Sequence, residues 1–112
     1  MAQTQLIKGV LEGCVLATIA EHEVYGYELI QALRQHGFTN LVGGTVYPLL
    51  LKLEKNGDLT STLKPSADGP NRKYYQLTAQ GQQTLATFAT NWQQLQVNVA
   101  KILRQVTNDD PS

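Results

Sequence analysis

Residues 43–78 read GGTVYPLLLKLEKNGDLTSTLKPSADGPNRKYYQLT, and the spacing of their apolar residues changes within this stretch. Between Thr45 and Gly57 the apolar residues recur at helical spacing, with Pro48 in the expected first turn. The runs LTSTLK and RKYYQL are then rich in β-branched and aromatic residues and flank the turn-forming segment PSADGPN. The stretch therefore predicts a helix with Thr45 as its N-cap, followed by a β-hairpin.

Two more helices are expected before this stretch. The segment QLIKGVLEGCVLATIAEH places apolar residues at helical spacing from Leu6 to Ile19. The segment YGYELIQALRQHG starts near Tyr25 and ends at Gly37, which suits a left-handed helix cap. Two short helices joined by a glycine-containing connection, with a hairpin after the second, are the outline of a winged helix-turn-helix.

One long helix is expected after the hairpin, from its N-cap Thr78 to about Val106. Apolar residues recur along it at alternating steps of three and four: Leu85, Phe88, Trp92, Leu95, Val99, Ile102 and Val106. A single helix cannot bury this seam alone, so we expect it to pack partly against the first helix and partly against a second copy of the chain. The second contact predicts a homodimer, with Leu6 and Val10 of the first helix joining the interface. The predicted fold class is mainly α with a small β-hairpin: a winged helix-turn-helix followed by one long C-terminal helix.

The composition limits the classes of function. A chain of 112 residues suits one domain, and its single cysteine, Cys14, cannot form an intrachain disulfide. We expect a cytoplasmic protein with no membrane partner, because the sequence has neither a leader-like start nor an apolar run of about 20 residues. Neither His22, His36 and Cys14 nor any other set has the spacing of a metal site or a nucleophile–base pair. The sequence therefore predicts no cofactor, no metal and no enzyme.

The net charge is zero, but residues 45–75 hold five bases against three acids. Within and around this region, YGYELIQAL, GGTVYPLLLKLEKNGDL and GPNRKYYQLTAQG, with a C-terminal helix containing NW, together resemble the PadR-type transcriptional regulators. The resemblance covers residues 6–106, and the single C-terminal helix is similar to the compact branch of that family. It implies a winged helix-turn-helix DNA-binding domain over 1–77, a dimerisation helix over 78–108 and a disordered tail over 109–112.

The resemblance also implies a function. Such proteins are homodimers that bind a near-palindromic operator in double-stranded DNA, with the third helix in the major groove and the wing on the flanking backbone. They commonly repress genes and are released by small molecules. The residues that we predict to contact DNA are Tyr25, Gly26, Thr45, Tyr47, Pro48, Lys52, Lys64, Arg72, Lys73 and Tyr74.

Several of these residues have a purely structural alternative. Thr45 could serve only as a helix cap, Tyr47 only as a packed aromatic residue, and Tyr25 only as a helix start on the core. Because side chains alternate along a strand, Tyr74 and Tyr75 are expected to point to opposite faces, with one of them packing the wing onto the domain.

The resemblance further implies a flat aromatic effector held between the two copies of Trp92, with Leu6 and Val10 completing the pocket. The alternative is that Trp92 is an ordinary residue of the dimer core. For the whole protein, the second hypothesis is a ligand-binding or protein-interaction module on the same fold that does not bind DNA.

Overall fold

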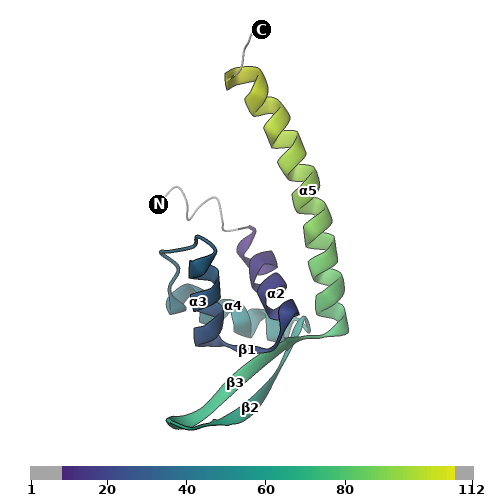
Figure 1. Cartoon of the computed structure of the whole chain (residues 1–112). Coiled ribbons are helices and arrows are strands. Elements are labelled where there is room, and N and C mark those ends of the chain that lie inside the picture. The colour runs from purple at the N-terminus through teal and green to yellow at the C-terminus, as the bar shows by residue number, and fades with distance from the viewer. Residues whose placement is uncertain (1–8, 108–112) are drawn as a thin grey trace.

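The structure is a computed structural model, and it describes residues 9–107. The elements follow one another as α2 (Leu11–Glu21), β1 (Val24–Tyr25), α3 (Gly26–Gln35), α4 (Gly43–Lys55), β2 (Leu59–Ser66), β3 (Gly69–Leu77) and α5 (Ala79–Thr107). The three short helices cluster together, β2 and β3 project from them as the wing, and α5 rises away on the other side (Figure 1). The predicted fold class is confirmed, while the predicted tail over 109–112 lies outside the described residues.

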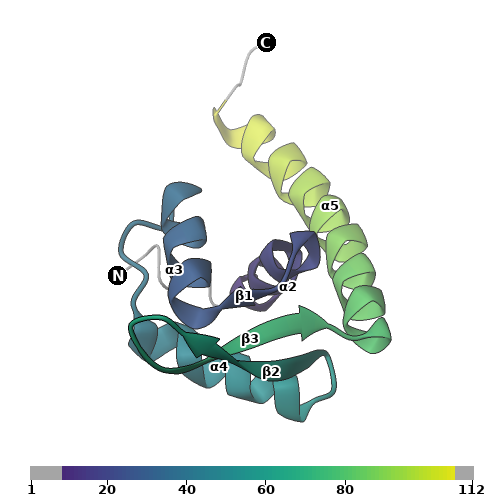
Figure 2. The ribbon, with the colours of Figure 1, turned by 60° about the horizontal axis from the view of Figure 1, so that its bottom comes forward.

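The hydrophobic core lies between the three short helices and one face of the sheet. Its most deeply buried side chains come from all three helices: Val15, Leu16, Leu29, Val46, Leu50 and Leu53. Leu59 and Tyr75 close the core from the sheet, and α4 runs along the hairpin (Figure 2). Burial of one such large aliphatic side chain stabilises the fold by about 1.5–3 kcal/mol, so the core fixes how α4 and the wing sit relative to each other.

The sheet has three strands rather than the predicted two, in the order β1-β3-β2. The two-residue strand β1 pairs Val24 with Tyr75 and Tyr25 with Tyr74. Two residues are too few to produce a recognisable alternation in the sequence, which is why β1 was not predicted. Because Tyr25 is also the N-cap of α3, β1 attaches the start of that helix directly to the wing.

Helix ends agree with the sequence at the glycines and disagree at the start of α4. Gly37 and Gly57 adopt φ of +112° and +92° after α3 and α4, as left-handed caps do. Helix α4, however, begins at Gly43, and its N-cap is Val42, whose carbonyl accepts the N–H of Thr45 at 3.0 Å. The prediction of Thr45 as N-cap is therefore wrong, because the apolar spacing gave no sign of a first turn made of two glycines.

A partly buried polar junction joins the end of α4 to the start of α5. Thr78 Oγ1 accepts the N–H of Gly81 at 2.9 Å, which confirms Thr78 as a cap, and donates to the carbonyl of Gly57 at 2.6 Å. The carboxylate of Asp58, which is buried, accepts the hydroxyl of Thr84 at 2.8 Å. These five residues form what we call the Asp58 junction.

Replacing Gly81 by alanine is expected to lower the free energy of unfolding by about 1–3 kcal/mol. A Cβ atom at this position would collide with the backbone oxygen of Asp58, which a rigid junction cannot move aside. Gly44→Ala is the matched control, because a Cβ there meets nothing within 4 Å and alanine favours a helix. Urea unfolding followed by circular dichroism measures both variants, and equal stability would show that the junction yields.

Candidate nucleic-acid interface

Four tyrosines gather where α3, α4 and the wing meet: Tyr25, Tyr27, Tyr47 and Tyr74. The ring of Tyr25 stacks on that of Tyr27 at 6.4 Å and meets the ring of Tyr74 edge-on at 5.3 Å. The ring of Tyr47 covers Gly26, and any side chain at Gly26 would collide with it. Gly26 is therefore buried, and its contribution to this surface is to seat the Tyr47 ring.

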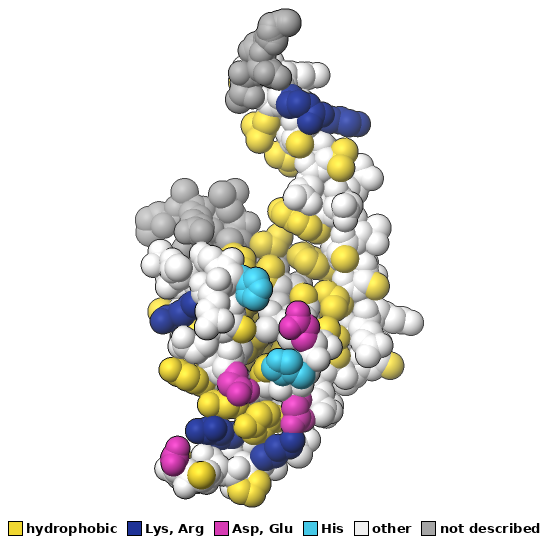
Figure 3. All heavy atoms as spheres, in the orientation of Figure 1, with side chains coloured by type: hydrophobic (Ala, Val, Ile, Leu, Met, Phe, Trp, Pro, Cys, Tyr) yellow, Lys and Arg dark blue, Asp and Glu magenta, His cyan; other side chains and the backbone are white. Residues whose placement is uncertain are grey.

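The face of the wing that points away from the core carries cations resting on these tyrosines. Lys64 and Arg72 are register partners in the hairpin and, with Tyr74, form what we call the outer face of the wing. The Arg72 guanidinium lies 4.4 Å from the centre of the Tyr25 ring, and the Lys64 ammonium lies 5.1 Å from that of Tyr74. At the lower end of the molecule, Lys and Arg side chains lie beside hydrophobic ones, with acidic side chains nearby (Figure 3).

The opposite face of β3 serves a structural purpose. Tyr75 is 5% exposed and belongs to the core, so it is the tyrosine that packs the wing onto the domain. Lys73 points the same way and forms an ion pair with Glu54 of α4 at 3.0 Å. The predicted pair of wing cations is therefore divided, with Arg72 on the outer face and Lys73 between the wing and α4.

Glu54 is the acceptor that holds the wing to α4. The hydroxyl of Ser61 donates to it at 2.6 Å, and this bond, followed by that from Lys73, lowers the pKa of its carboxyl. The hydrogen bond between Lys73 and Glu54 raises the pKa of Lys73. Both groups are therefore charged at neutral pH.

Acid is expected to weaken this attachment in a defined range. Because folding lowers the pKa of Glu54, its stabilising effect is complete above the ordinary glutamate value of about 4.3 and is lost as the pH falls through the lowered value. Ser61→Ala and Lys73→Gln should each raise the pKa of Glu54, since both side chains donate a hydrogen bond to its carboxylate. A carboxyl-detected NMR titration measures both shifts, and an unchanged pKa in either variant would contradict the assignment of that contact.

Helix α4 presents its N-terminal half to solvent. Thr45 and Pro48 are exposed, and the backbone at Gly44 is open, since a Cβ there meets nothing. The first N–H groups of a helix have no partner within it and suit an anion. Lys52, one turn further on, forms an ion pair with Glu12 of α2 at 2.6 Å.

The predicted seam on α5 divides into two parts. Leu85 and Phe88 are half-buried against α2, and the Phe88 ring occupies the space left open by Gly13. From Trp92 onward the seam residues are exposed: Trp92, Leu95, Val99, Ile102 and Val106. Val10 is half-buried beside the start of α2, while Leu6 lies outside the described residues.

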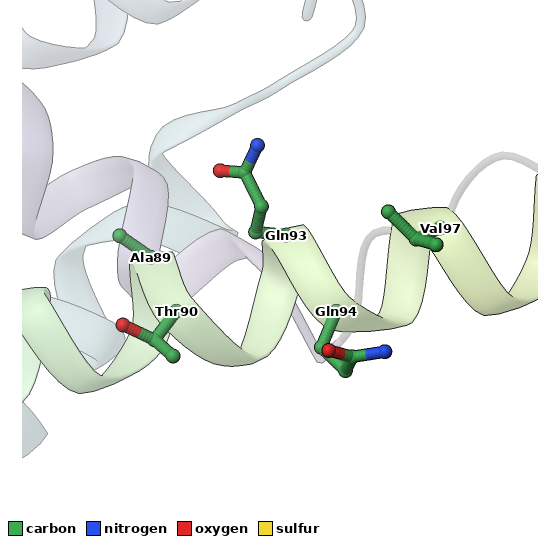
Figure 4. Close-up of a pocket in the computed structure, with 5 residues that line it drawn as sticks. All are labelled: Ala89, Thr90, Gln93, Gln94 and Val97. Atoms are coloured by element: carbon green, nitrogen blue, oxygen red, sulfur yellow. The ribbon is translucent and has the colours of Figure 1, made fainter.

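Two hollows lined by described residues do not include Trp92 in their lining. An open cavity of about 450 Å³ lies between α2 and α3, with Cys14, Val24 and Phe38 among its lining residues. A shallow depression on α5 is lined by Ala89, Thr90, Gln93, Gln94 and Val97, and Gln93 points to one side of the helix while Thr90 and Gln94 point to the other (Figure 4). Neither hollow contains a residue of the predicted effector pocket.

Sequence reasoning missed three contributors to this candidate surface. Tyr27 was not predicted because an aromatic residue near a helix start has no specific meaning by itself. Gly44 was not predicted because a glycine has no side chain that indicates a contact. Glu23 was missed because its partner, Lys64, is 41 residues away along the chain. The sequence around Glu23 and that around Lys64 carry no local signal for such a pairing.

Residues 9–107 contain no group of three or more histidine, cysteine, aspartate or glutamate side chains placed to hold a metal ion. Within that same range, each helix is too short or too polar to cross a membrane.

The fold and this surface define a winged helix-turn-helix protein with basic and aromatic groups on its wing. A model of the PadR-like transcriptional regulator family matches residues 15–87. The chain belongs to this family, which confirms the predicted resemblance, and members of the family are transcriptional regulators rather than enzymes.

Solved structures and a sequence relative agree with this assignment. A Streptococcus transcriptional regulator is 52% identical, with 88% of this chain and 97% of that one covered and a TM-score of 0.80. A PadR-like transcriptional regulator from Bacillus cereus is 46% identical, with 89% and 97% covered and a TM-score of 0.81. A transcriptional regulator of Mycobacterium tuberculosis is 38% identical over 71 residues, which are 63% of this chain and 64% of that protein.

Proposed function

We propose that this transcriptional regulator is a cytoplasmic, homodimeric repressor that binds a near-palindromic DNA operator and is released by a small aromatic effector. In this proposal residues 1–77 bind DNA and residues 78–108 form the dimerisation helix. The observation that carries it is the outer face of the wing, where Arg72 and Lys64 rest on tyrosines beside the open start of α4.

Each part of this surface suits a part of a DNA duplex. Thr45, Tyr47 and Pro48 lie on the exposed N-terminal half of α4, the part of a recognition helix that reaches base edges in the major groove. Arg72 offers a planar fork of donors that matches a phosphate, and it lies on the projecting wing. Base contacts would then come from α4 and backbone contacts from the wing.

Dimerisation is supported by the exposed part of the α5 seam. Two copies of a helix that pair about a two-fold axis bury the same apolar residues on each other. The two winged domains would then address two half-sites, which a dimer of this kind places about one helical turn apart, roughly 34 Å. This symmetry is the reason for proposing a near-palindromic operator.

The proposal is tested by selecting duplexes from a random library with the purified protein and measuring their affinity by fluorescence anisotropy. We expect a two-fold symmetric consensus, binding at least about 1000-fold tighter than to unrelated DNA, and an affinity that falls steeply with salt. No enrichment of any sequence, at low and moderate salt, would overturn the proposal.

The effector is proposed to bind at the dimer interface beside Trp92, the single tryptophan of the chain. Its emission therefore reports directly on this site. A flat phenolic or aromatic compound should quench it saturably and lower the affinity for the operator. Absence of saturable quenching across a panel of such compounds would remove the Trp92 pocket from the proposal.

The second candidate is a ligand-binding or protein-interaction module that does not bind DNA. It is favoured by the ion pairs that engage Lys52, Lys64 and Lys73, because these carboxylates neutralise lysines that DNA would need. The same selection experiment separates the two functions, since a module of this kind enriches no operator.

A further inference from the structure

The two cations of the outer face are in different electrostatic situations. The Lys64 ammonium donates to one carboxylate oxygen of Glu23, and the Gln76 amide donates to the other at 2.8 Å. Glu23 lies in the short connection between α2 and β1, and its carboxylate accepts hydrogen bonds from side chains of both wing strands, β2 and β3. The hydrogen bonds from Lys64 and Gln76 lower the pKa of Glu23, so the carboxylate is charged at neutral pH.

Arg72 provides the comparison. It is the register partner of Lys64 and faces the same way, but among residues 9–107 it forms no ion pair. Its guanidinium rests on the face of the Tyr25 ring, which leaves its hydrogen-bond donors available to a ligand. Of these two neighbouring cations, Lys64 is thus paired with a carboxylate and Arg72 is not.

We propose that Glu23 takes the place of a DNA phosphate at Lys64 and thereby limits the affinity of the protein for DNA of any sequence. This inference rests on the proposed DNA binding. A carboxylate and a phosphate present the same kind of acceptor to an ammonium group, so Glu23 competes with the DNA backbone for Lys64. A phosphate that approaches Lys64 also meets the negative charge of Glu23.

The exposure of the pair sets the strength of this effect. The side chains of Lys64 and Glu23 are 45% and 26% exposed, and ion pairs at such positions are weak because water competes with them. DNA can therefore displace Glu23, which makes the carboxylate a limit on affinity rather than a block. The limit is independent of sequence, since phosphate contacts carry no information about the bases.

The test compares Glu23→Gln with Glu21→Gln. Each substitution removes one negative charge, and the two positions are two residues apart. Glu21, however, is exposed and forms no ion pair within residues 9–107. Affinities for the selected operator and for an unrelated duplex are measured over a range of salt concentrations. Glu23→Gln should raise both affinities about tenfold at 0.1 M salt and steepen the salt slope by about 0.9 for each subunit that gains a phosphate contact. Glu21→Gln should change them less than about twofold, since it frees no cation.

A double-mutant cycle with Lys64→Gln identifies the cation that is released. In the natural sequence Lys64→Gln should cost little, whereas in the Glu23→Gln background it should abolish the gain. Equal effects of Glu23→Gln and Glu21→Gln would overturn the inference. A loss of DNA affinity in Glu23→Gln with an unchanged salt slope would also overturn it, because Glu23 would then only hold the wing in place. If neither the natural protein nor Glu23→Gln binds any DNA, the proposed function itself fails.

Discussion

Val99→Glu is expected to raise the dissociation constant of the dimer about 100-fold. Val99 lies in the middle of the exposed α5 seam, where two-fold pairing would bury it. A glutamate there would place an unpaired carboxylate, and its symmetry mate, in an apolar interface, which costs roughly 3 kcal/mol or more, and each 1.4 kcal/mol is a factor of ten. Sedimentation equilibrium over a range of protein concentrations measures the change.

Val97→Glu is the matched control for this prediction. Val97 and Val99 are each 45% exposed and lie in the same helix, but Val97 is on the flank away from the seam. The control should leave the dissociation constant within about threefold, because its glutamate remains in water. A similar loss for both variants would place the dimer contact elsewhere on α5.

The loss of the dimer should also weaken binding to the operator. Two winged domains on one molecule bind two half-sites at a high effective concentration, which is worth a factor of about 10²–10⁴. At protein concentrations below its new dissociation constant, Val99→Glu should therefore bind the full operator little better than a single half-site. The natural protein should prefer the full operator strongly.

Arg72→Ala is expected to lower the affinity for every DNA sequence about tenfold at 0.1 M salt. Arg72 is the cation of the outer face that forms no ion pair with a carboxylate of residues 9–107. Its contact with the Tyr25 ring orients the guanidinium toward the side on which a DNA backbone would bind. Each lost phosphate contact lowers the salt slope by about 0.9, so a dimer that loses two should lose about 1.8. Anisotropy titrations between about 0.05 and 0.2 M salt measure both quantities.

The neighbouring residue provides the control for Arg72. Lys73→Ala removes the same charge, but this lysine points to the inner face and is held by Glu54. Lys73→Ala should change the salt slope by less than half as much as Arg72→Ala does. It should instead lower the stability of the fold, because it removes the ion pair with Glu54. If the two variants lower the slope equally, the assignment of the outer face as the DNA-facing surface is wrong.

Much of the fold could be predicted because its signals are local. The change of apolar spacing at Gly57 marks the passage from α4 to the hairpin, and the glycines at 37 and 57 mark helix ends through their own backbone preferences. The seam of α5 was predictable because every member lies on the one helix. Alternation along β3 separated Tyr74 from Tyr75, but only the packing showed that Tyr75 is the buried one.

What could not be predicted depends on residues that are distant in the chain. Lys52 meets Glu12 across 40 positions, and a count of charges gives no indication of that pairing. Strand β1 exists because β3 offers a partner, since two residues have no strand pattern of their own. The start of α4 depends on the backbone of Val42, whose carbonyl accepts the N–H groups of Thr45 and Val46, and no side chain caps this helix start.

The Asp58 junction has a mechanical consequence. Since α5 has 29 residues, it is about 44 Å long and can act as a lever. Hydrogen bonds from Thr78 and Thr84 attach its N-terminal end to the turn that ends α4. A lever without a loose joint transmits a tilt at one end as a displacement at the other. In a two-fold pair, a small change in the angle between the two levers would therefore alter the span between the two α4 helices, which the fixed pitch of DNA either matches or rejects.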